Sequence, residues 1–357
     1  MNRDGSVPQI DSIRCEAGLN KYEQAHLIRF LESNMAFEGN RKMQLLLSRI
    51  RRRLDIVTRN SCLPAEYFAE NSELGAMSTG ARQILYESYS RLLLDRLLDG
   101  FKPKHPIQNL ITVSCTGYQT PGLDFQIIER LGLKNPFRYN VGAMGCYAGI
   151  TGLRLANELS GNTLLVCLEL CSLHFQADCD FSSVASNALF ADGTVMVEVG
   201  LPSTRGKDQS SSLFEIKSFA SYQIPHTLDK MSWLLRDHGF IMFLDPEVPE
   251  LIAGCIEGQI VDWLAGQGLS TSDIRGWVIH PGSTSIVHTV QKCLKLDPSV
   301  TEHSLNVLRK HGNMSSGTVF FILEDLMQQK DLKPGDKVVM VAFGPGLMAE
   351  MCLVEKT

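Results

Sequence analysis

The stretch VGAMGCYAGITGLRLANEL (residues 141–159), with the NTLLVCLEL that follows it (162–170), decides the fold class. A glycine-rich turn leads into a helix whose apolar residues recur every three or four positions, and a short apolar strand comes next. Two further strands are predicted before it, at 107–115 and 137–142. This alternation of strands and helices predicts an α/β protein with a mixed or parallel sheet.

The second half of the chain repeats this plan. A helix predicted at 249–268 precedes the strand GWVIH (276–280), and each half ends on a glycine-marked pair of strands, LFADGTVMVEVG (189–200) and AFGPGLMAEMCLVE (342–355). We therefore expect two similar α/β units that pack face to face, an N-terminal half over 1–205 and a C-terminal half over 206–357. The polar segment that begins near residue 201 is the expected boundary between the two halves.

Composition excludes several classes of protein. The 357 residues are 44% hydrophobic and carry 34 Lys+Arg against 39 Asp+Glu, a net charge of −5. This disfavours a disordered chain and bulk binding of nucleic acid. No apolar run reaches the roughly 18 residues of a membrane span. The ten cysteines are scattered without a CxxC pair, and the first residues lack a signal-peptide layout, so we expect a soluble, cytoplasmic, reduced protein with no metal site.

Three residues could carry chemistry. Cys146 lies at the start of a predicted helix, where unpaired N–H groups favour a thiolate. His280 ends an apolar strand, and Asn313 follows a glycine. Taken singly, they are as readily a buried thiol, a structural histidine and a helix N-cap. Together they fit a cysteine nucleophile that acts on thioesters, with histidine and amide donors for the carbonyl oxygen. Papain-like proteases share the order Cys, His, Asn, but their Cys-Gly-Ser-Cys-Trp signature is absent.

The motifs around these residues resemble a known family. CTGYQTPGLDFQ (115–126), GCYAGITGLRLANEL (145–159), SNALFADGTVMVEVG (186–200), WVIHPGS (277–283), HGNMSSGTVFFIL (311–323) and AFGPGL (342–347) are similar, in order, to the signature blocks of type III polyketide synthases, the chalcone-synthase-like family. The resemblance covers about residues 45–355. It implies the thiolase fold, two duplicated α/β units stacked as five αβαβα layers, usually as a homodimer.

The resemblance also implies a mechanism. Cys146 would take the starter acyl group from coenzyme A, and His280 with Asn313 would hold the malonyl-CoA thioester carbonyl. Loss of carbon dioxide would give an enolate that attacks the Cys146 thioester, with no metal or organic cofactor. Repeated extension and cyclisation would release a pyrone or resorcinol-type product.

Further positions match the family's cavity. Phe190 matches its gate phenylalanine, and counting back from Pro249 places Met242 at the second gate, with Phe240 and Phe243 as alternative registers. Thr120 matches a residue that reaches across the dimer interface, and the Thr120–Pro121 bond is a candidate cis peptide by the same likeness. The remaining predicted cavity residues are Cys115, Cys171 and His174, where plant enzymes have threonines, and Ser315, which keeps the family serine.

Four residues are expected to bind coenzyme A. Arg49 and Arg53 lie in the cluster SRIRRRL (48–54) and match basic positions at the mouth of the family's tunnel, although a solvated basic helix face is an equal alternative. Gly282 and Ser283 follow His280 and would let the pantetheine arm pass closely.

Departures from the plant pattern predict a bacterial-type enzyme, and we favour a fatty acyl starter. Two alternatives stay open. The first is a single-condensation synthase like ketoacyl synthase III, or an acyltransferase, that uses an acyl carrier protein as its partner. The second is a non-catalytic thiolase-fold subunit, which the intact set of Cys146, His280 and Asn313 disfavours.

Overall fold

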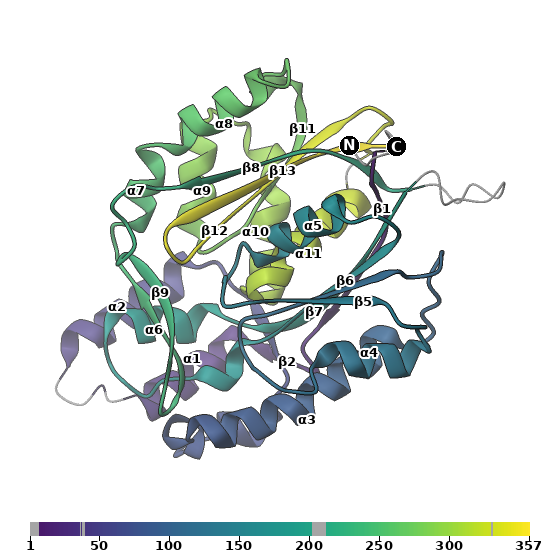
Figure 1. The fold of residues 1–357 in the computed structure, drawn as a ribbon. Helices are drawn as coiled ribbons and strands as arrows, with labels where there is room; N and C mark the ends of the chain where they lie inside the picture. Colours follow the sequence, from purple (N-terminus) through teal and green to yellow (C-terminus); the bar gives the residue numbers. More distant parts are fainter. Residues whose placement is uncertain (1–6, 36, 38–39, 202–211, 330) are drawn as a thin grey trace.

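The computed structural model describes residues 7–35, 37, 40–201, 212–329 and 331–357, so the boundary predicted between 205 and 206 lies outside the described residues. Within these ranges, nine strands form one hydrogen-bonded sheet in the order β11-β12-β13-β8-β1-β7-β6-β4-β5. The strands are β1 (Gln9–Ala17), β4 (Asn109–Ser114), β5 (Phe137–Gly142), β6 (Thr163–Leu170), β7 (Asp192–Gly200), β8 (Phe214–Gln223), β11 (Ile274–Ile279), β12 (Lys337–Gly344) and β13 (Met348–Lys356). Figure 1 shows their arrangement.

The sheet consists of two copies of one topology. In the first copy, β1 pairs antiparallel with β7, β7 antiparallel with β6, and β6 parallel with β4. In the second, β8, β13, β12 and β11 repeat these three relations in the same order. Within the described strands, β1 and β8 join the two copies through the short pairing of Gln9 with Glu215 and Ile10 with Phe214. The predicted duplication is therefore confirmed, with β5 as an addition to the first copy.

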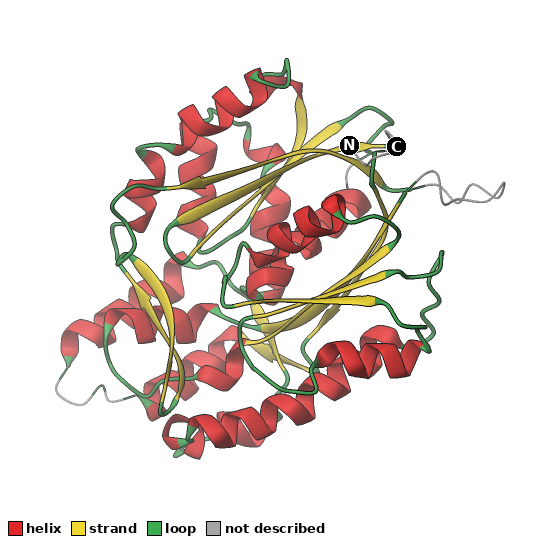
Figure 2. Ribbon diagram, viewed as in Figure 1, coloured by secondary structure: helices red, strands yellow, loops and turns green. Residues whose placement is uncertain are grey.

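Two helices lie between the copies and form the central layer (Figure 2). They are α5 (Ala148–Glu158) and α11 (Thr318–Gln329), and their apolar residues share one buried core with both sheets. Glycine lets α5 come close to its neighbours. A Cβ on Gly149 would lie 2.2 Å from the carbonyl oxygen of Ser316, and one on Gly152 would lie 2.7 Å from Leu165.

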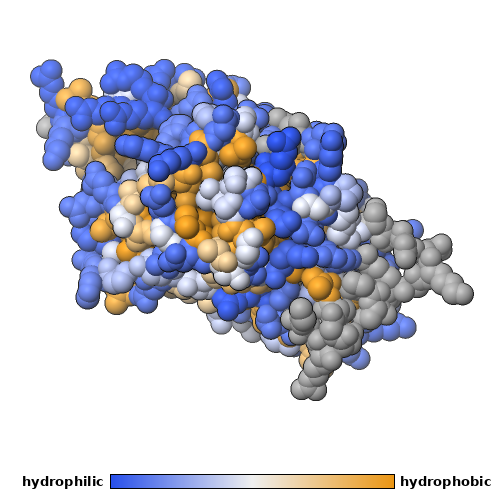
Figure 3. Space-filling model, turned by 90° about the horizontal axis from the view of Figure 1, so that it is seen from above, coloured by the Kyte–Doolittle hydropathy of each residue, from blue (hydrophilic) through white to orange (hydrophobic). Residues whose placement is uncertain are grey.

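The outer layers complete the expected αβαβα stack. A second core packs helices α1 (Gln24–Asn34), α3 (Thr79–Leu98), α4 (Leu123–Leu131) and α6 (Phe181–Leu189) on the first sheet. A third packs α7 (Val248–Ala253), α8 (Ile256–Ala265) and α9 (Thr284–Cys293) on the second. Seen from above, the face in Figure 3 has hydrophobic residues at its centre and hydrophilic ones around them. No helix within the described ranges is long and apolar enough to cross a membrane.

Smaller elements complete the fold around these layers. Helix α2 (Arg41–Arg53) contacts α6, and α10 (Glu302–His311) contacts β3 (Thr58–Ser61), which pairs with β2 (Asn20–Glu23). The hairpin of β9 (Met231–Arg236) and β10 (Gly239–Leu244) contacts α6. One prediction was wrong in detail, since the helix expected over 249–268 is the separate pair α7 and α8. The chain leaves helical geometry at Cys255, between the two.

Candidate active site

Cys146 lies in the tight turn between β5 and α5, one residue before the Tyr147 N-cap. Ala143 and Gly145 both have positive φ, 57° and 79°, which turns the chain sharply out of the strand. A Cβ on Gly145 would come within 2.5 Å of Pro345, so only glycine fits there. The turn is also tied to Cys115, whose sulfur accepts a hydrogen bond from the Gly145 N–H at 3.0 Å.

The environment of Cys146 keeps it protonated. Burial raises the pKa of its thiol to about 12, the Glu169 carboxylate adds to this, and hydrogen bonds with Ser315 and Asn313 oppose it. Burial thus opposes the thiolate that a helix N-terminus favours, and the thiolate stays a prediction. A base must remove the proton before the sulfur can attack a substrate.

His280 can be that base. It follows β11 directly, and its backbone N–H donates to the Val341 carbonyl at 2.8 Å. The side chain is 1% exposed, and burial lowers its pKa to about 3, so the ring is neutral. Neither ring nitrogen has a hydrogen-bond partner among the described residues. A buried, neutral and unpaired imidazole is available to accept or donate a proton.

Asn313 is oriented by the backbone that follows it. Its side-chain oxygen accepts a hydrogen bond from the Ser315 N–H at 2.8 Å, which leaves the amide N–H groups to point elsewhere. Ser315 makes this possible by adopting a positive φ of 50°, an uncommon conformation for a residue other than glycine. Asn313 also forms an isolated parallel bridge with Phe190, so the two halves of the chain meet at this point.

One cavity of about 420 Å³ brings most of the predicted site together. Its walls include Cys146, His280, Asn313, Phe190, Met242, Arg49, Arg53, Gly282 and Ser283. The two arginines are exposed, whereas His280 and Asn313 are buried, so the cavity has basic residues at the surface and uncharged ones inside, with Asp245, paired with Lys230, also in its wall. Leu244, Val248, Ile252 and Ile286 add apolar surface along the way.

A second cavity of about 30 Å³ lies behind the nucleophile. Cys146 shares it with the predicted residues Cys115, Cys171 and Ser315. Met242 lines the second cavity as well as the first, whereas Phe240 and Phe243 line neither. The geometry therefore favours Met242 over its two alternative registers.

Trp233, which the sequence did not single out, lies at the wall of the second cavity. Its indole N–H donates to the Cys115 carbonyl at 2.7 Å, and its ring stacks on Phe240 with centroids 5.6 Å apart. Phe190 and His174 contact the other sides of the same ring. This aromatic partition, made of Phe190, Trp233, Phe240 and His174, limits the room behind Cys146. Trp233 is one of several large apolar residues in the β9–β10 hairpin, so no local pattern set it apart.

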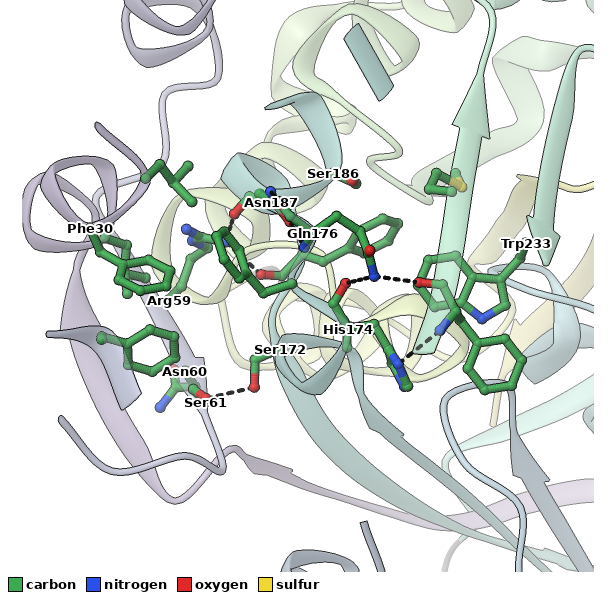
Figure 4. Close-up of a pocket in the computed structure, with 18 residues that line it drawn as sticks. Phe30, Arg59, Asn60, Ser61, Ser172, His174, Gln176, Ser186, Asn187 and Trp233 are labelled. Atoms are coloured by element: carbon green, nitrogen blue, oxygen red, sulfur yellow. Dashed lines mark hydrogen bonds between the residues drawn. The ribbon is translucent and has the colours of Figure 1, made fainter. Parts of the chain in front are cut away.

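Beyond the partition lies a third cavity of about 50 Å³ (Figure 4). His174 lines this third cavity and neither of the two that Cys146 lines, and both its ring nitrogens have hydrogen-bond partners. One bonds the Thr116 carbonyl at 2.6 Å and the other accepts from the Phe240 N–H at 3.1 Å. Thr120 is exposed at the surface beside a Thr120–Pro121 bond that is cis, as predicted. Its expected contact across a dimer interface stays a prediction.

Glu169 is a second functional candidate that the sequence did not single out. It is fully buried and accepts hydrogen bonds from the Cys115 N–H, the Thr116 hydroxyl and the Ser316 hydroxyl, at 3.0, 2.8 and 2.6 Å. Burial raises its pKa to about 7. Its position inside the apolar strand β6 gave it the pattern of an ordinary buried residue.

The structure contains no disulfide among the ten cysteines, all of which are described. Within the described ranges, no group of three or more His, Cys, Asp or Glu residues could hold a metal ion.

Comparison with known families decides the assignment. The model of the chalcone and stilbene synthase N-terminal domain matches residues 32–202, and that of the C-terminal domain matches residues 215–357. The chain belongs to the chalcone and stilbene synthase family. The predicted resemblance is thus confirmed, and with it the thiolase-type fold of these type III polyketide synthases.

Individual relatives agree with this family. The chain is 30% identical over 285 residues to the probable polyketide synthase 1 of Dictyostelium discoideum, covering 77% of this chain and 9% of that protein. It is 31% identical over 257 residues to a 3,5-dihydroxyphenylacetyl-CoA synthase of Streptomyces toyocaensis, covering 70% and 66%. The crystal structure of the C-terminal type III polyketide synthase domain of Steely1 from Dictyostelium superimposes with a TM-score of 0.87 at 25% identity, covering 98% and 99%.

Proposed function

We propose that this chain is a type III polyketide synthase that condenses an acyl-CoA starter with malonyl-CoA. The main evidence is the 420 Å³ cavity. It brings Cys146, the neutral His280 and the oriented amide of Asn313 together, and two arginines, Arg49 and Arg53, lie at its mouth. Guanidinium groups suit the phosphates of coenzyme A, and the apolar walls suit the pantetheine arm and an acyl chain.

The first step loads the starter. His280 takes the proton of the Cys146 thiol, and the sulfur attacks the thioester carbonyl of the acyl-CoA. The bond from carbonyl carbon to coenzyme A sulfur breaks, and the leaving thiolate recovers the proton from His280. Cys146 then carries the acyl group as a thioester, and coenzyme A leaves as a free thiol.

The second step extends the chain by two carbons. The thioester oxygen of malonyl-CoA accepts hydrogen bonds from Asn313 and His280, which stabilise negative charge on that oxygen as carbon dioxide departs. Phe190 presents an apolar ring to the carboxylate and favours its loss. The enolate carbon attacks the acyl carbonyl, and the Cys146 sulfur leaves. No metal or organic cofactor enters these steps.

We predict a fatty acyl starter, for which the apolar walls of the 420 Å³ cavity are suitable. The cavity of about 30 Å³ behind Cys146 favours a second candidate, a short acyl starter with few extensions. The product would in either case be a small pyrone or resorcinol-type ring.

Incubation of the purified protein with malonyl-CoA and acyl-CoAs of increasing length tests this function. Mass spectrometry would detect free products and the acyl adduct on Cys146, with Cys146→Ser as the control. Cyclic products from one starter class, absent in the control, are the expected result. An adduct that forms only from acyl carrier protein would support the single-condensation alternative, and no adduct from any donor would contradict the nucleophile.

We also propose a homodimer. Phe137, at the start of the edge strand β5, is 72% exposed, and Tyr118, in the loop that follows β4 and carries Thr120, is 78% exposed. An unpaired sheet edge with a large exposed apolar side chain is typical of a surface that a second copy covers.

A further inference from the structure

Two buried polar side chains outside the proposed mechanism hold the end of α6. Arg59, in β3, is 5% exposed, and Gln24, at the start of α1, is 6% exposed. Both precede the catalytic cysteine by more than 80 residues, yet both reach the helix that ends at Phe190.

Between them, Arg59 and Gln24 bind three of the last carbonyl groups of this helix. Arg59 lies beside Asn187 in Figure 4, and its Nη1 donates to the Asn187 carbonyl at 2.8 Å. The same nitrogen donates to the Phe190 carbonyl at 2.7 Å. Gln24 Nε2 donates to the Ala188 carbonyl at 2.8 Å. Arg59 Nε also donates to Gln24 Oε1 at 2.7 Å, so the two side chains support one another.

The remaining carbonyl of this segment binds the catalytic asparagine. The Leu189 carbonyl accepts from the Asn313 N–H at 3.0 Å, and the Asn313 carbonyl accepts from the Ala191 N–H at 2.8 Å. Gly312, with φ of 77°, packs on the stem of Arg59, where a Cβ would lie 2.9 Å from Arg59 Cγ. Arg59 therefore contacts the backbone on both sides of the junction between Phe190 and Asn313.

A positive charge at this point has a specific physical effect. Carbonyls at a helix C-terminus carry partial negative charge, and a guanidinium fork can bind two of them in a fixed geometry. Burial lowers the pKa of Arg59 to about 9, with Asp192 opposing the shift, so the group stays charged near neutral pH. The charge holds the chain at Phe190 more firmly than a neutral side chain would.

We propose that Arg59, supported by Gln24, is a positioning residue for decarboxylation: it fixes the Phe190 ring and the Asn313 amide relative to each other. The inference rests on the proposed function, in which these two residues act on malonyl-CoA. It assigns Arg59 no direct part in acylation of Cys146, in which the sulfur attacks and His280 moves the proton, although Asn313 also bonds the thiol.

The test separates the two half-reactions. Acylation is followed as the Cys146 adduct formed from an acyl-CoA by mass spectrometry. Decarboxylation is followed as release of carbon dioxide from malonyl-CoA. In Arg59→Met, we expect kcat for decarboxylation to fall by about 100-fold, as when one oxyanion donor is lost. KM for malonyl-CoA and the acylation rate should stay close to those of the wild-type protein. Arg59→Lys keeps the charge but can bind fewer carbonyls, so its kcat for decarboxylation should lie between that of Arg59→Met and that of the wild-type protein.

Arg82→Met is the matched control. Arg82 is also buried, at 1% exposed, and also binds backbone carbonyls, those of Met77, Leu74 and Leu173. It should lower stability without changing the ratio of decarboxylation to acylation. If Arg59→Met is not folded, Gln24→Met is expected to show a selective loss of decarboxylation of about tenfold.

Three outcomes would contradict the inference. The first is wild-type decarboxylation in folded Arg59→Met, or in Gln24→Met where it is the variant tested. The second is a parallel loss of both half-reactions in that variant, which would indicate a structural role only. The third is a wild-type protein that neither loads Cys146 nor decarboxylates malonyl-CoA, which would overturn the proposed function as well.

Discussion

Buried titratable groups set the reactivity at the centre of the molecule. Burial raises the pKa of the Cys146 thiol and the Glu169 carboxylate adds to this, while His280, which lines the same cavity, is neutral. A thiol with a raised pKa reacts slowly with oxidants and alkylating agents, because the thiolate is the reactive form.

Glu169→Gln should make Cys146 more reactive. The amide is isosteric and removes the negative charge that raises the pKa of the thiol, so the pKa of Cys146 should fall. The rate of iodoacetamide alkylation, measured from pH 7 to 10, should rise in the variant by several-fold at each pH. Because the pKa of Glu169 is itself about 7, the difference should shrink towards pH 6, where the wild-type carboxyl is protonated. Equal rates at pH 9 would contradict this role.

The same variant should change how stability depends on pH. Burial raises the pKa of Glu169 from 4.5 to about 7 in the folded chain. The folded state therefore binds the proton more tightly than the unfolded state, and wild-type stability is lost as pH rises from about 4.5 through 7. The Glu169→Gln side chain does not titrate, so the variant does not lose stability in this way. The difference in unfolding free energy, variant minus wild type, should therefore rise by roughly 3 kcal/mol from pH 4 to pH 8.5. Urea denaturation at both pH values measures this difference, and an equal difference at the two pH values would contradict the prediction.

Trp233→Ala should enlarge the product. Removal of the indole opens the aromatic partition and joins the 30 Å³ cavity behind Cys146 to the 50 Å³ cavity on its far side. We expect longer acyl-CoA starters to be accepted, or more malonyl units to be added, as measured by product mass. Leu235→Ala, on the same strand but 54% exposed, is the control and should leave the product mass unchanged. The same product from Trp233→Ala as from wild type would show that the partition does not limit chain length.

At the residue scale, sequence motifs predicted some parts of the site and missed others. Cys146, His280 and Asn313 stood in glycine-rich turns, and such turns are visible in a sequence. Trp233, Glu169 and Arg59 act through contacts with residues more than 30 positions away, and nothing in their local sequence marks them. The protonation of Cys146 was also hidden, because burial depends on both halves of the chain.

At the scale of elements, the spacing of helix α5 from its neighbours controls the site. Gly149 brings α5 against the carbonyl of Ser316, next to the Ser315 that bonds Cys146. The glycine pattern in GCYAGITG was visible in the sequence, but its reason was not. It lies in the contact between the first and second halves, which only the folded chain shows. The split of the helix expected over 249–268 was likewise hidden, because Gly254 and Cys255 fit a helical pattern.

Gly149→Ala should loosen the central layer. The new methyl group would lie 2.2 Å from a backbone oxygen, so α5 or the Ser316 segment must shift, at a cost of about 1–3 kcal/mol in unfolding free energy. Activity should fall further than stability, because Cys146 and Ser315 move apart. Gly258→Ala in α8 is the matched control. Nothing lies within 4 Å of its Cβ, so it should gain a few tenths of a kcal/mol. Chemical denaturation and product yield of both variants check this, and an equally stable Gly149→Ala would refute it.

At the scale of the whole molecule, the duplicated sheet brings the nucleophile from one copy and the histidine and asparagine from the other. The edge strand β5 belongs to the first copy alone and leaves its outer side unpaired. The order of strands in each copy was not predictable from local patterns, since pairings such as β13 with β8 join residues more than 120 positions apart.

Phe137→Glu should weaken association of two copies. A charge at a 72% exposed apolar position on that edge would have to be buried in a dimer, which costs on the order of 2 kcal/mol or more. Sedimentation velocity should show a dimer for the wild type and a shift towards monomer for the variant. Leu228→Glu, 72% exposed and away from the edge, is the control. A wild-type monomer, or an unaffected variant, would count against a dimer through β5.

The position of β13 has a consequence for how the protein is made. β13 follows β12 along the chain, yet it lies between β8 and β12 and joins them in the second sheet. A growing polypeptide that has reached Gly344 already contains Cys146, His280 and Asn313, but it lacks the strand that joins β8 to β12. The second sheet is therefore complete only after β13 has been synthesised and has inserted between strands that were made before it.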